Sequence, residues 1–190
     1  ALNLLTTVDV RVPTPYGFFN GVLLMELVTD EDGLSAPGLG EVEHSPEQAR
    51  EYHAFLIDQI VRMLCAGLVH GDLSEYNVLV GADGPVIIDL PQVVSATGNN
   101  NAREMLLRDV HNITQTLGRS LPALLTTRFG EEMWAKFEIG ELQPDSILTG
   151  EFVDDENTAD VAGTLLDIED AREEAIRRQE GRDEANLPDQ

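Results

Sequence analysis

Residues 70–80 read HGDLSEYNVLV, a polar run that passes directly into an apolar one. A second apolar run, PVIID, follows at residues 85–89, and the segment between the two, residues 81–84, reads GADG. Two short apolar segments around a glycine-rich turn predict a β-hairpin. Polar residues therefore stand where the first strand of this hairpin begins and where the second one ends.

Pairing within this hairpin decides which polar side chains meet. The strands are expected to be antiparallel with a four-residue turn, so the start of the first lies beside the end of the second. Asn77 and Asp89 thus become neighbours at the open end, and Asp72 lies on the loop that leads in. Phosphoryl transfer needs such a set, because a base must align the acceptor hydroxyl while oxygen ligands hold Mg²⁺. The sequence predicts a metal site with an adjacent base.

The composition limits the partners of the protein. Among 190 residues there are 12 lysines and arginines against 35 aspartates and glutamates, and the net charge is −23. This charge disfavours binding to bare nucleic acid or to an anionic membrane surface. The sequence shows no signal peptide and no apolar run of about 18 residues. Its single cysteine, Cys65, fits a reducing compartment, so a cytoplasmic protein is expected.

Further elements are predicted from turn residues and hydrophobic periodicity. Asn20-Gly21 predicts a hairpin within residues 8–28, whose second strand reads VLLMEL. Ser45-Pro46-Glu47-Gln48 has the pattern of a capping box and begins an amphipathic helix that ends near Gly67. Helices are also expected over residues 101–117, 121–129, 131–138 and 158–180, and residues 151–190 carry 14 acids against 4 arginines.

The two polar motifs resemble the protein-kinase superfamily, whose catalytic loop reads H-x-D-x-x-x-x-N and precedes a metal-binding aspartate. HGDLSEYN with IIDLPQ is similar to the RIO family of atypical serine/threonine kinases. In that family serine stands two residues after the catalytic aspartate, and D-x-P-Q replaces D-F-G. Other segments resemble the family too, the last of them its bacterial members: MELV at residues 25–28, Ala36-Pro37 with Leu39, Arg108-Asp109-Val110 with Asn112, and LTG at residues 148–150.

The resemblance implies an α+β, protein-kinase-like fold, with a mainly helical C-terminal lobe containing β-hairpins, preceded by the last strands of the N-terminal lobe. Residues 1–30 are then the end of the N-terminal lobe and the hinge, residues 31–150 the C-terminal lobe, and residues 151–190 an acidic C-terminal helix and tail. No G-x-G-x-x-G precedes the first hairpin, and the sole lysine, Lys136, follows the catalytic loop. The chain alone is therefore expected to be inactive.

The resemblance also implies roles for single residues. Asp72 is the catalytic residue, Asn77 and Asp89 bind the metal, and Ser74 contacts phosphate. Backbone atoms of Glu26 and Val28 contact adenine, and Met25 and Asn77 also belong to the cofactor-binding residues. The cofactors are ATP and Mg²⁺, with Mn²⁺ as an alternative metal. The partner is a protein substrate associated with the ribosome, and neither nucleic acid nor membrane is bound directly. Because the aspartate at position 89 accepts phosphate in this family, autophosphorylation or an ATPase switch is a second mode of action.

Two other functions stay open at the level of sequence. Small-molecule phosphotransferases of the aminoglycoside or choline kinase type share the His-Gly-Asp, Asn and Asp pattern, but they usually follow the metal aspartate with an aromatic and an acidic residue. The other alternative is a nucleotide-binding assembly factor without turnover. His70 and Trp134 are interpreted as structural, whereas Glu75 and Tyr76 either contact the substrate or brace the loop.

Overall fold

The computed structural model of the chain describes residues 2–153, and the predicted helix over residues 158–180 lies outside them. All but the last of the described residues belong to one unit, Ala1–Phe152. The helices of this unit are α1 (Leu2–Thr7), α2 (Pro46–Cys65), α3 (Ala102–Gly118) and α4 (Phe129–Glu138), and short 3₁₀ turns cover Leu39–Glu41, Leu90–Gln92 and Pro122–Thr126. Its strands are β1 (Pro15–Phe19), β2 (Val22–Met25), β3 (Leu68–Val69), β4 (Val78–Gly81), β5 (Gly84–Ile87) and β6 (Val94–Ser95).

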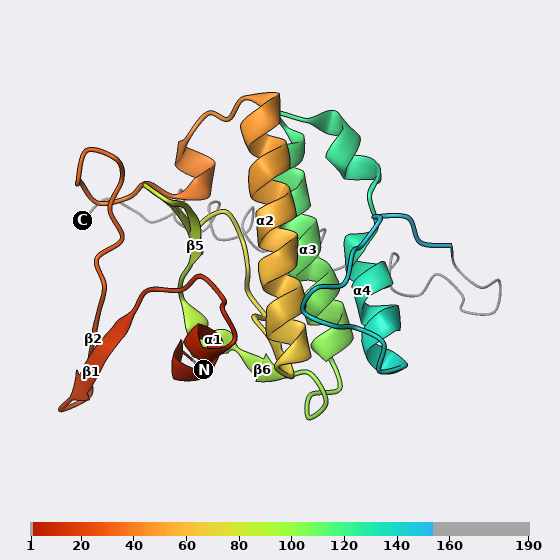
Figure 1. Ribbon diagram of the computed structural model, residues 1–190, viewed down its shortest axis with the longest axis horizontal. Coiled ribbons are helices and arrows are strands. Elements are labelled where there is room, and N and C mark those ends of the chain that lie inside the picture. Colours follow the sequence, from red (N-terminus) through yellow and green to blue (C-terminus); the bar gives the residue numbers. More distant parts are fainter. Residues whose placement is uncertain (1, 154–190) are drawn as a thin grey trace, which may run out of the picture. The chain divides into compact units, whose positions relative to one another are not determined.

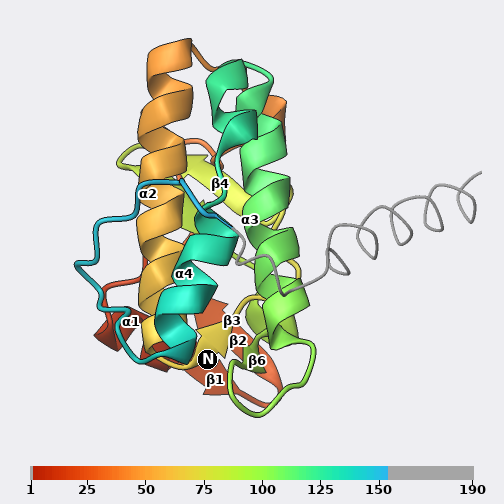
Figure 2. The same cartoon turned by 90° about the vertical axis from the view of Figure 1, so that its right-hand side faces the viewer.

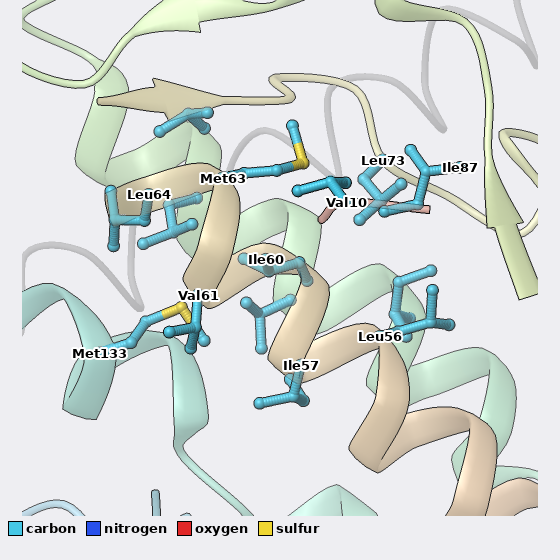
Figure 3. Packing of buried hydrophobic residues seen from close by; sticks show 14 of the residues in the cluster. Val10, Leu56, Ile57, Ile60, Val61, Met63, Leu64, Leu73, Ile87 and Met133 are labelled. Atoms are coloured by element: carbon cyan, nitrogen blue, oxygen red, sulfur yellow. The ribbon is translucent and has the colours of Figure 1, made fainter. Parts of the chain in front are cut away.

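Two long helices, α2 and α3, lie side by side, and α4 packs against both (Figure 1; Figure 2). α2 begins as the sequence predicts, because the Gln48 amide donates to the Ser45 hydroxyl and the Ser45 amide donates to the Gln48 side chain. It ends at Cys65, and Gly67 follows in the left-handed region with a φ of 76°. The apolar faces of these helices form one core, part of which Figure 3 shows.

One buried polar pair joins the two long helices inside this core. The ring of His53 on α2 and the hydroxyl of Thr114 on α3 form a hydrogen bond of 2.9 Å across the helix interface. Burial lowers the pKa of His53 to about 4, so the ring is neutral where the two helices meet. Trp134 of α4 is buried in the same core, as its structural interpretation predicts.

The strands form three separate antiparallel pairs, β1 with β2, β3 with β6, and β4 with β5. The first pair turns at Asn20 and Gly21, both with positive φ, which confirms the predicted Asn-Gly hairpin. Its second strand is shorter than predicted and ends at Met25. The mixture of helices with small sheets confirms the α+β class.

Two details of the expected hairpin and helix pattern are wrong. The turn between β4 and β5 has two residues, Ala82 and Asp83, because Gly81 and Gly84 already pair. Residues 121–129 do not form an α-helix, since only Pro122–Thr126 make a 3₁₀ turn. The hydroxyls of Thr126 and Thr127 donate to the carbonyls three residues earlier, and such local bonds compete with a continuing helix.

The segment before the first hairpin holds an element that the sequence analysis did not predict. α1 is a single short helix, and Leu5 from it, followed by Val10 and Val12, joins the main core. The backbone at Arg11 is bonded on both sides, since its amide donates to the Gln59 side chain and its carbonyl accepts from the Ile87 amide. Among residues 2–153, no helix combines the length and apolar composition that a membrane span requires.

Candidate active site

The loop of residues 70–77, which joins β3 to β4, carries Asp72 at the surface. β3 ends at Val69, and Gly71 turns the chain with a φ of 83°. Gly71 and Leu73 are buried on either side of the exposed Asp72. Because Leu73 belongs to the main core, the loop is attached to the core directly beside the carboxylate that it presents (Figure 3).

The carboxylate of Asp109 on α3 fastens this loop. One of its oxygens accepts from the Gly71 amide and the other from the Leu73 amide, both at 2.8 Å. Asp109 is only 1% exposed, and burial raises its pKa to about 7, although the two amides and the Arg108 guanidinium favour the ionised form. The two amides flank Asp72, so α3 sets the backbone position of Asp72 from both sides.

Two neighbours of Asp109 bind the carbonyls of the same loop residues. Arg108 donates from Nη2 to the Gly71 carbonyl at 2.8 Å, and Asn112 donates from Nδ2 to the Leu73 carbonyl at 3.0 Å. In the sequence these residues are recognisable only as part of a helix that resembles the family, and no role follows for them from the sequence alone. A signal was present, because an acid at position 109 falls on the buried face of the helix, where it needs partners.

His70 links the same loop to the strand that leads to Asp89. Its ring is 2% exposed, and Nε2 donates to the Ile88 carbonyl at 3.0 Å. Burial lowers the pKa of the ring, while the Ile88 carbonyl and the carboxylates of Asp72 and Asp89 oppose that shift. Both carboxylates therefore lie near one neutral imidazole, and His70 has the structural position that its interpretation predicts.

Asn77 and Asp89 stand at the open end of the β4–β5 hairpin. Val78 pairs with Ile87, and the Ile88 amide donates to the Asn77 carbonyl at 3.0 Å. Asn77 thus lies opposite the residue directly before Asp89. The Asn77 side chain donates from Nδ2 to the Asp72 carbonyl at 2.7 Å, and this bond leaves the amide oxygen Oδ1 as an acceptor.

Asp89 follows β5 by two residues and has an unusual backbone conformation. Its φ and ψ are both 60°, in the left-handed region, and the 3₁₀ turn Leu90–Gln92 begins directly after it. Aspartate and asparagine tolerate this region better than other residues with a side chain. The chain therefore turns away from the hairpin at Asp89, two residues after β5 ends at Ile87, and Asp89 is exposed there.

The oxygen atoms at this end of the hairpin suit a magnesium ion. Asp89 offers a carboxylate and Asn77 an amide oxygen, and Mg²⁺ commonly takes one or two protein ligands while keeping several waters. The described residues hold no group of three or more His, Cys, Asp and Glu side chains that could bind a metal.

The segment predicted to bind adenine runs beside the same hairpin. Val28 is buried with Ala36 and with Val86 of β5, and Leu79 packs against this small cluster. The Thr29 carbonyl accepts from the Ala82 amide, and other backbone bonds join residues 37 and 38 to β4. In contrast, Met25 at the end of β2 is exposed. The hinge-like segment is thus attached to the hairpin that carries Asn77.

The remaining loop residues differ in their surroundings. The Asn77 amide donates to the Ser74 carbonyl at 3.0 Å, and Ser74 itself is half-buried. Glu75 packs so closely on Gly40 that an added Cβ there would lie 2.9 Å from its Cγ, which favours the bracing interpretation for Glu75. Tyr76 is 79% exposed, so its ring is open to a partner.

Comparison with known proteins places these features in a family. Residues 1–129 match the RIO domain family. The RIO-type serine/threonine-protein kinase Rio1 of Haloferax volcanii is 41% identical over 111 residues, which are 58% of this chain and 37% of that protein. The serine/threonine-protein kinase RIO1 of Homo sapiens is 33% identical over 151 residues, 79% of this chain and 25% of that protein.

A third relative, the RIO-type serine/threonine-protein kinase Rio1 of Thermoplasma acidophilum, is 35% identical over 113 residues, which are 60% of this chain and 57% of that protein. The chain therefore spans less than two thirds of each of these three relatives. The matched residues 1–129 include the 70–77 loop, the β4–β5 hairpin and α3.

Gly71→Ala is expected to destabilise the protein more than Gly21→Ala, although both glycines have a φ of 83°. Both variants strain the left-handed backbone, but a Cβ at residue 71 would also lie 3.0 Å from the Gln92 carbonyl, whereas one at residue 21 meets nothing within 4 Å. The extra loss in the free energy of unfolding should be about 1–3 kcal/mol, measured by urea denaturation. Equal losses for the two variants would contradict this packing of Gly71 against Gln92.

Proposed function

The chain belongs to the RIO domain family, and from this premise we propose that the protein transfers the γ-phosphoryl group of Mg·ATP to serine or threonine residues of a protein. The observation that carries the proposal is the loop that presents Asp72. Its two flanking residues are bonded to Asp109, Arg108 and Asn112, while the Asp72 carboxylate itself is exposed. A rigid mounting for an open carboxylate is what alignment of an acceptor hydroxyl requires.

In this mechanism Asp72 accepts the proton of the attacking hydroxyl or orients it in line with the phosphorus. Asn77 Oδ1 and the Asp89 carboxylate would hold Mg²⁺, which supplies positive charge against the phosphate oxygens. Ser74, on the same loop, contacts a phosphate, and the backbone of Glu26 and Val28 binds adenine. Mn²⁺ suits the same oxygen ligands. Residues 1–30 then serve as the end of an N-terminal lobe with its hinge, and residues 31–150 as the C-terminal lobe.

The same geometry fits an ATPase switch in which the Asp89 carboxylate receives the phosphoryl group as ADP leaves, and water then hydrolyses the aspartyl phosphate to release inorganic phosphate. Asp89 is exposed and directly follows Ile88, whose amide is bonded to the carbonyl of the proposed metal ligand Asn77. The strongly acidic composition disfavours direct binding to nucleic acid. We therefore propose that the partner is a protein, either free in the cytoplasm or bound to the ribosome. The two modes differ in where the phosphate ends, on a partner or on the protein itself.

Asp72→Ala should lower phosphoryl transfer by about 10²- to 10⁴-fold, because it removes the group that handles the acceptor proton. The assay follows γ-labelled phosphate from Mg·ATP onto protein with the full-length gene product, and nucleotide affinity is measured in parallel by calorimetry. Asp83→Ala serves as the control, since Asp83 is an exposed acid at the opposite end of the same hairpin. Transfer at the wild-type rate by Asp72→Ala would refute the role given to Asp72.

Asp89→Ala should abolish the dependence of nucleotide binding on Mg²⁺, because the only carboxylate proposed as a metal ligand is lost. Titration of ADP in the presence and absence of Mg²⁺ gives the measurement, again with Asp83→Ala as the matched loss of one carboxylate. If Asp89→Ala keeps the wild-type enhancement by Mg²⁺, the metal assignment is wrong even though the loop geometry stands.

The activity should fall as the pH drops through about 7, the pKa of buried Asp109. A protonated carboxyl loses one acceptor oxygen, so one of the two amides beside Asp72 loses its partner. The stability of the protein should change with pH in the opposite direction to its activity. The pKa of folded Asp109 lies above the unfolded value of about 4, so the folded state binds the proton more tightly. The contribution of Asp109 to stability therefore declines as the pH rises from about 4 to 7.

This opposition separates a loosened loop from simple unfolding. Transfer rates between about pH 5.5 and 8.5 should show the step in the wild type, and Asp109→Asn, which keeps only one acceptor oxygen, should be slow throughout without that step. A step of equal size in Asp109→Asn would show that another group titrates.

A further inference from the structure

The base of the β1–β2 hairpin departs from an ordinary antiparallel ladder. Pro15 pairs with Met25, so Thr14 and Glu26 face each other at the next position. The Glu26 amide donates to the Thr14 carbonyl at 2.9 Å. In a regular hydrogen-bonded pair the Thr14 amide would return a bond to the Glu26 carbonyl. Here it donates instead to Oε2 of the Glu26 side chain, also at 2.9 Å.

The residues around Thr14 favour this hydrogen bond between its amide and the Glu26 side chain. Thr14 stands between Pro13 and Pro15, which have no amide hydrogen and restrict the backbone, so the Thr14 amide is the only backbone donor in these three residues. The Thr14 hydroxyl donates to the same carboxylate oxygen at 2.8 Å. These hydrogen bonds lower the pKa of Glu26, so the side chain is ionised at neutral pH and is the stronger acceptor of the two.

The result is an open pair of backbone groups on the hinge-like segment. The Val28 carbonyl is taken by the Ala36 amide at 3.0 Å. Within the described part of the chain, neither the Glu26 carbonyl nor the Val28 amide takes part in a hydrogen bond. An acceptor and a donor two residues apart match the amino group and ring nitrogen at one edge of adenine.

We propose that the Glu26 carboxylate accepts the hydrogen bond from the Thr14 amide that the Glu26 carbonyl would otherwise accept. The carbonyl thereby stays free to accept a hydrogen bond from the exocyclic amino group of adenine. This rests on the proposed function, because it deepens the assignment of the nucleotide site. Glu26 is in this view a positioning residue, since its side chain acts through its own backbone. Without the carboxylate, the Thr14 amide would donate to the Glu26 carbonyl and extend the β1–β2 pairing by one hydrogen bond. That carbonyl could then no longer accept from adenine.

Three variants of the full-length protein separate this role from a merely structural one. Glu26→Ala should weaken ADP binding about tenfold, the effect of one lost hydrogen bond. Glu26→Gln keeps a side-chain acceptor for the Thr14 amide and should bind ADP within about threefold of the wild type. The double variant Thr14→Pro with Glu26→Ala lacks the competing amide, so it should regain most of the lost affinity.

Two controls accompany these titrations. Magnesium tripolyphosphate carries the phosphates without a base, so its affinity should be unchanged by Glu26→Ala. Glu31→Ala removes an exposed acid a few residues away and should leave ADP binding intact. Thermal unfolding of each variant establishes that the protein is folded.

The outcomes separate a failure of the proposed function from a failure of the role proposed for Glu26. If the wild type binds neither ADP nor tripolyphosphate, the proposed function fails. If the wild type binds ADP and Glu26→Ala binds it equally well, only the positioning role of Glu26 fails. Equal losses in Glu26→Ala and Glu26→Gln, or no recovery in the double variant, would also overturn it, because charge or general stability would then explain the effect.

Discussion

The hydrogen bonds between the Asp109 carboxylate and the two amides around Asp72 are the constraint on which the rest of the site depends. The 70–77 loop has no regular secondary structure of its own, so its shape must come from its neighbours. α3 provides that shape because it is held by the core shared with α2 and α4. The helices thus fix the backbone on which Asp72, the proposed catalytic residue, is exposed.

Much of the fold could be predicted from the sequence because its signals are local. Ser45 and Gln48 cap α2 within one turn, and Asn20-Gly21 specifies a hairpin irrespective of what packs on it. The 3₁₀ turn at Pro122–Thr126 escaped prediction since hydrophobic periodicity does not register the two threonine hydroxyls that bond back to the chain. α1 is too short for periodicity to detect, and it is held by long-range packing of Leu5 instead.

The candidate site, too, could be predicted from the sequence only where its signals are local. The spacing of Asp72, Asn77 and Asp89 is visible in the sequence, and the strand pairing that joins the last two follows from the alternation of short apolar runs and turns. The sequence marks Asp109 as an acid on the buried face of a helix but does not show which groups it binds, because its partners lie more than thirty positions away and meet it only after α3 packs. Likewise, Glu26 looks like an ordinary surface acid in the sequence. Only the structure shows that the Thr14 amide donates to its side chain and not to its backbone carbonyl.

The left-handed conformation of Asp89 has a consequence for how this protein can evolve. A position with φ and ψ of 60° accepts asparagine, aspartate or glycine with little strain and resists most other residues. Replacement of Asp89 by asparagine would remove the negative charge but leave the backbone undisturbed. A single tolerated substitution would therefore remove the proposed metal ligand while keeping the fold, and a descendant of this chain would have a short path from the proposed kinase to a folded scaffold.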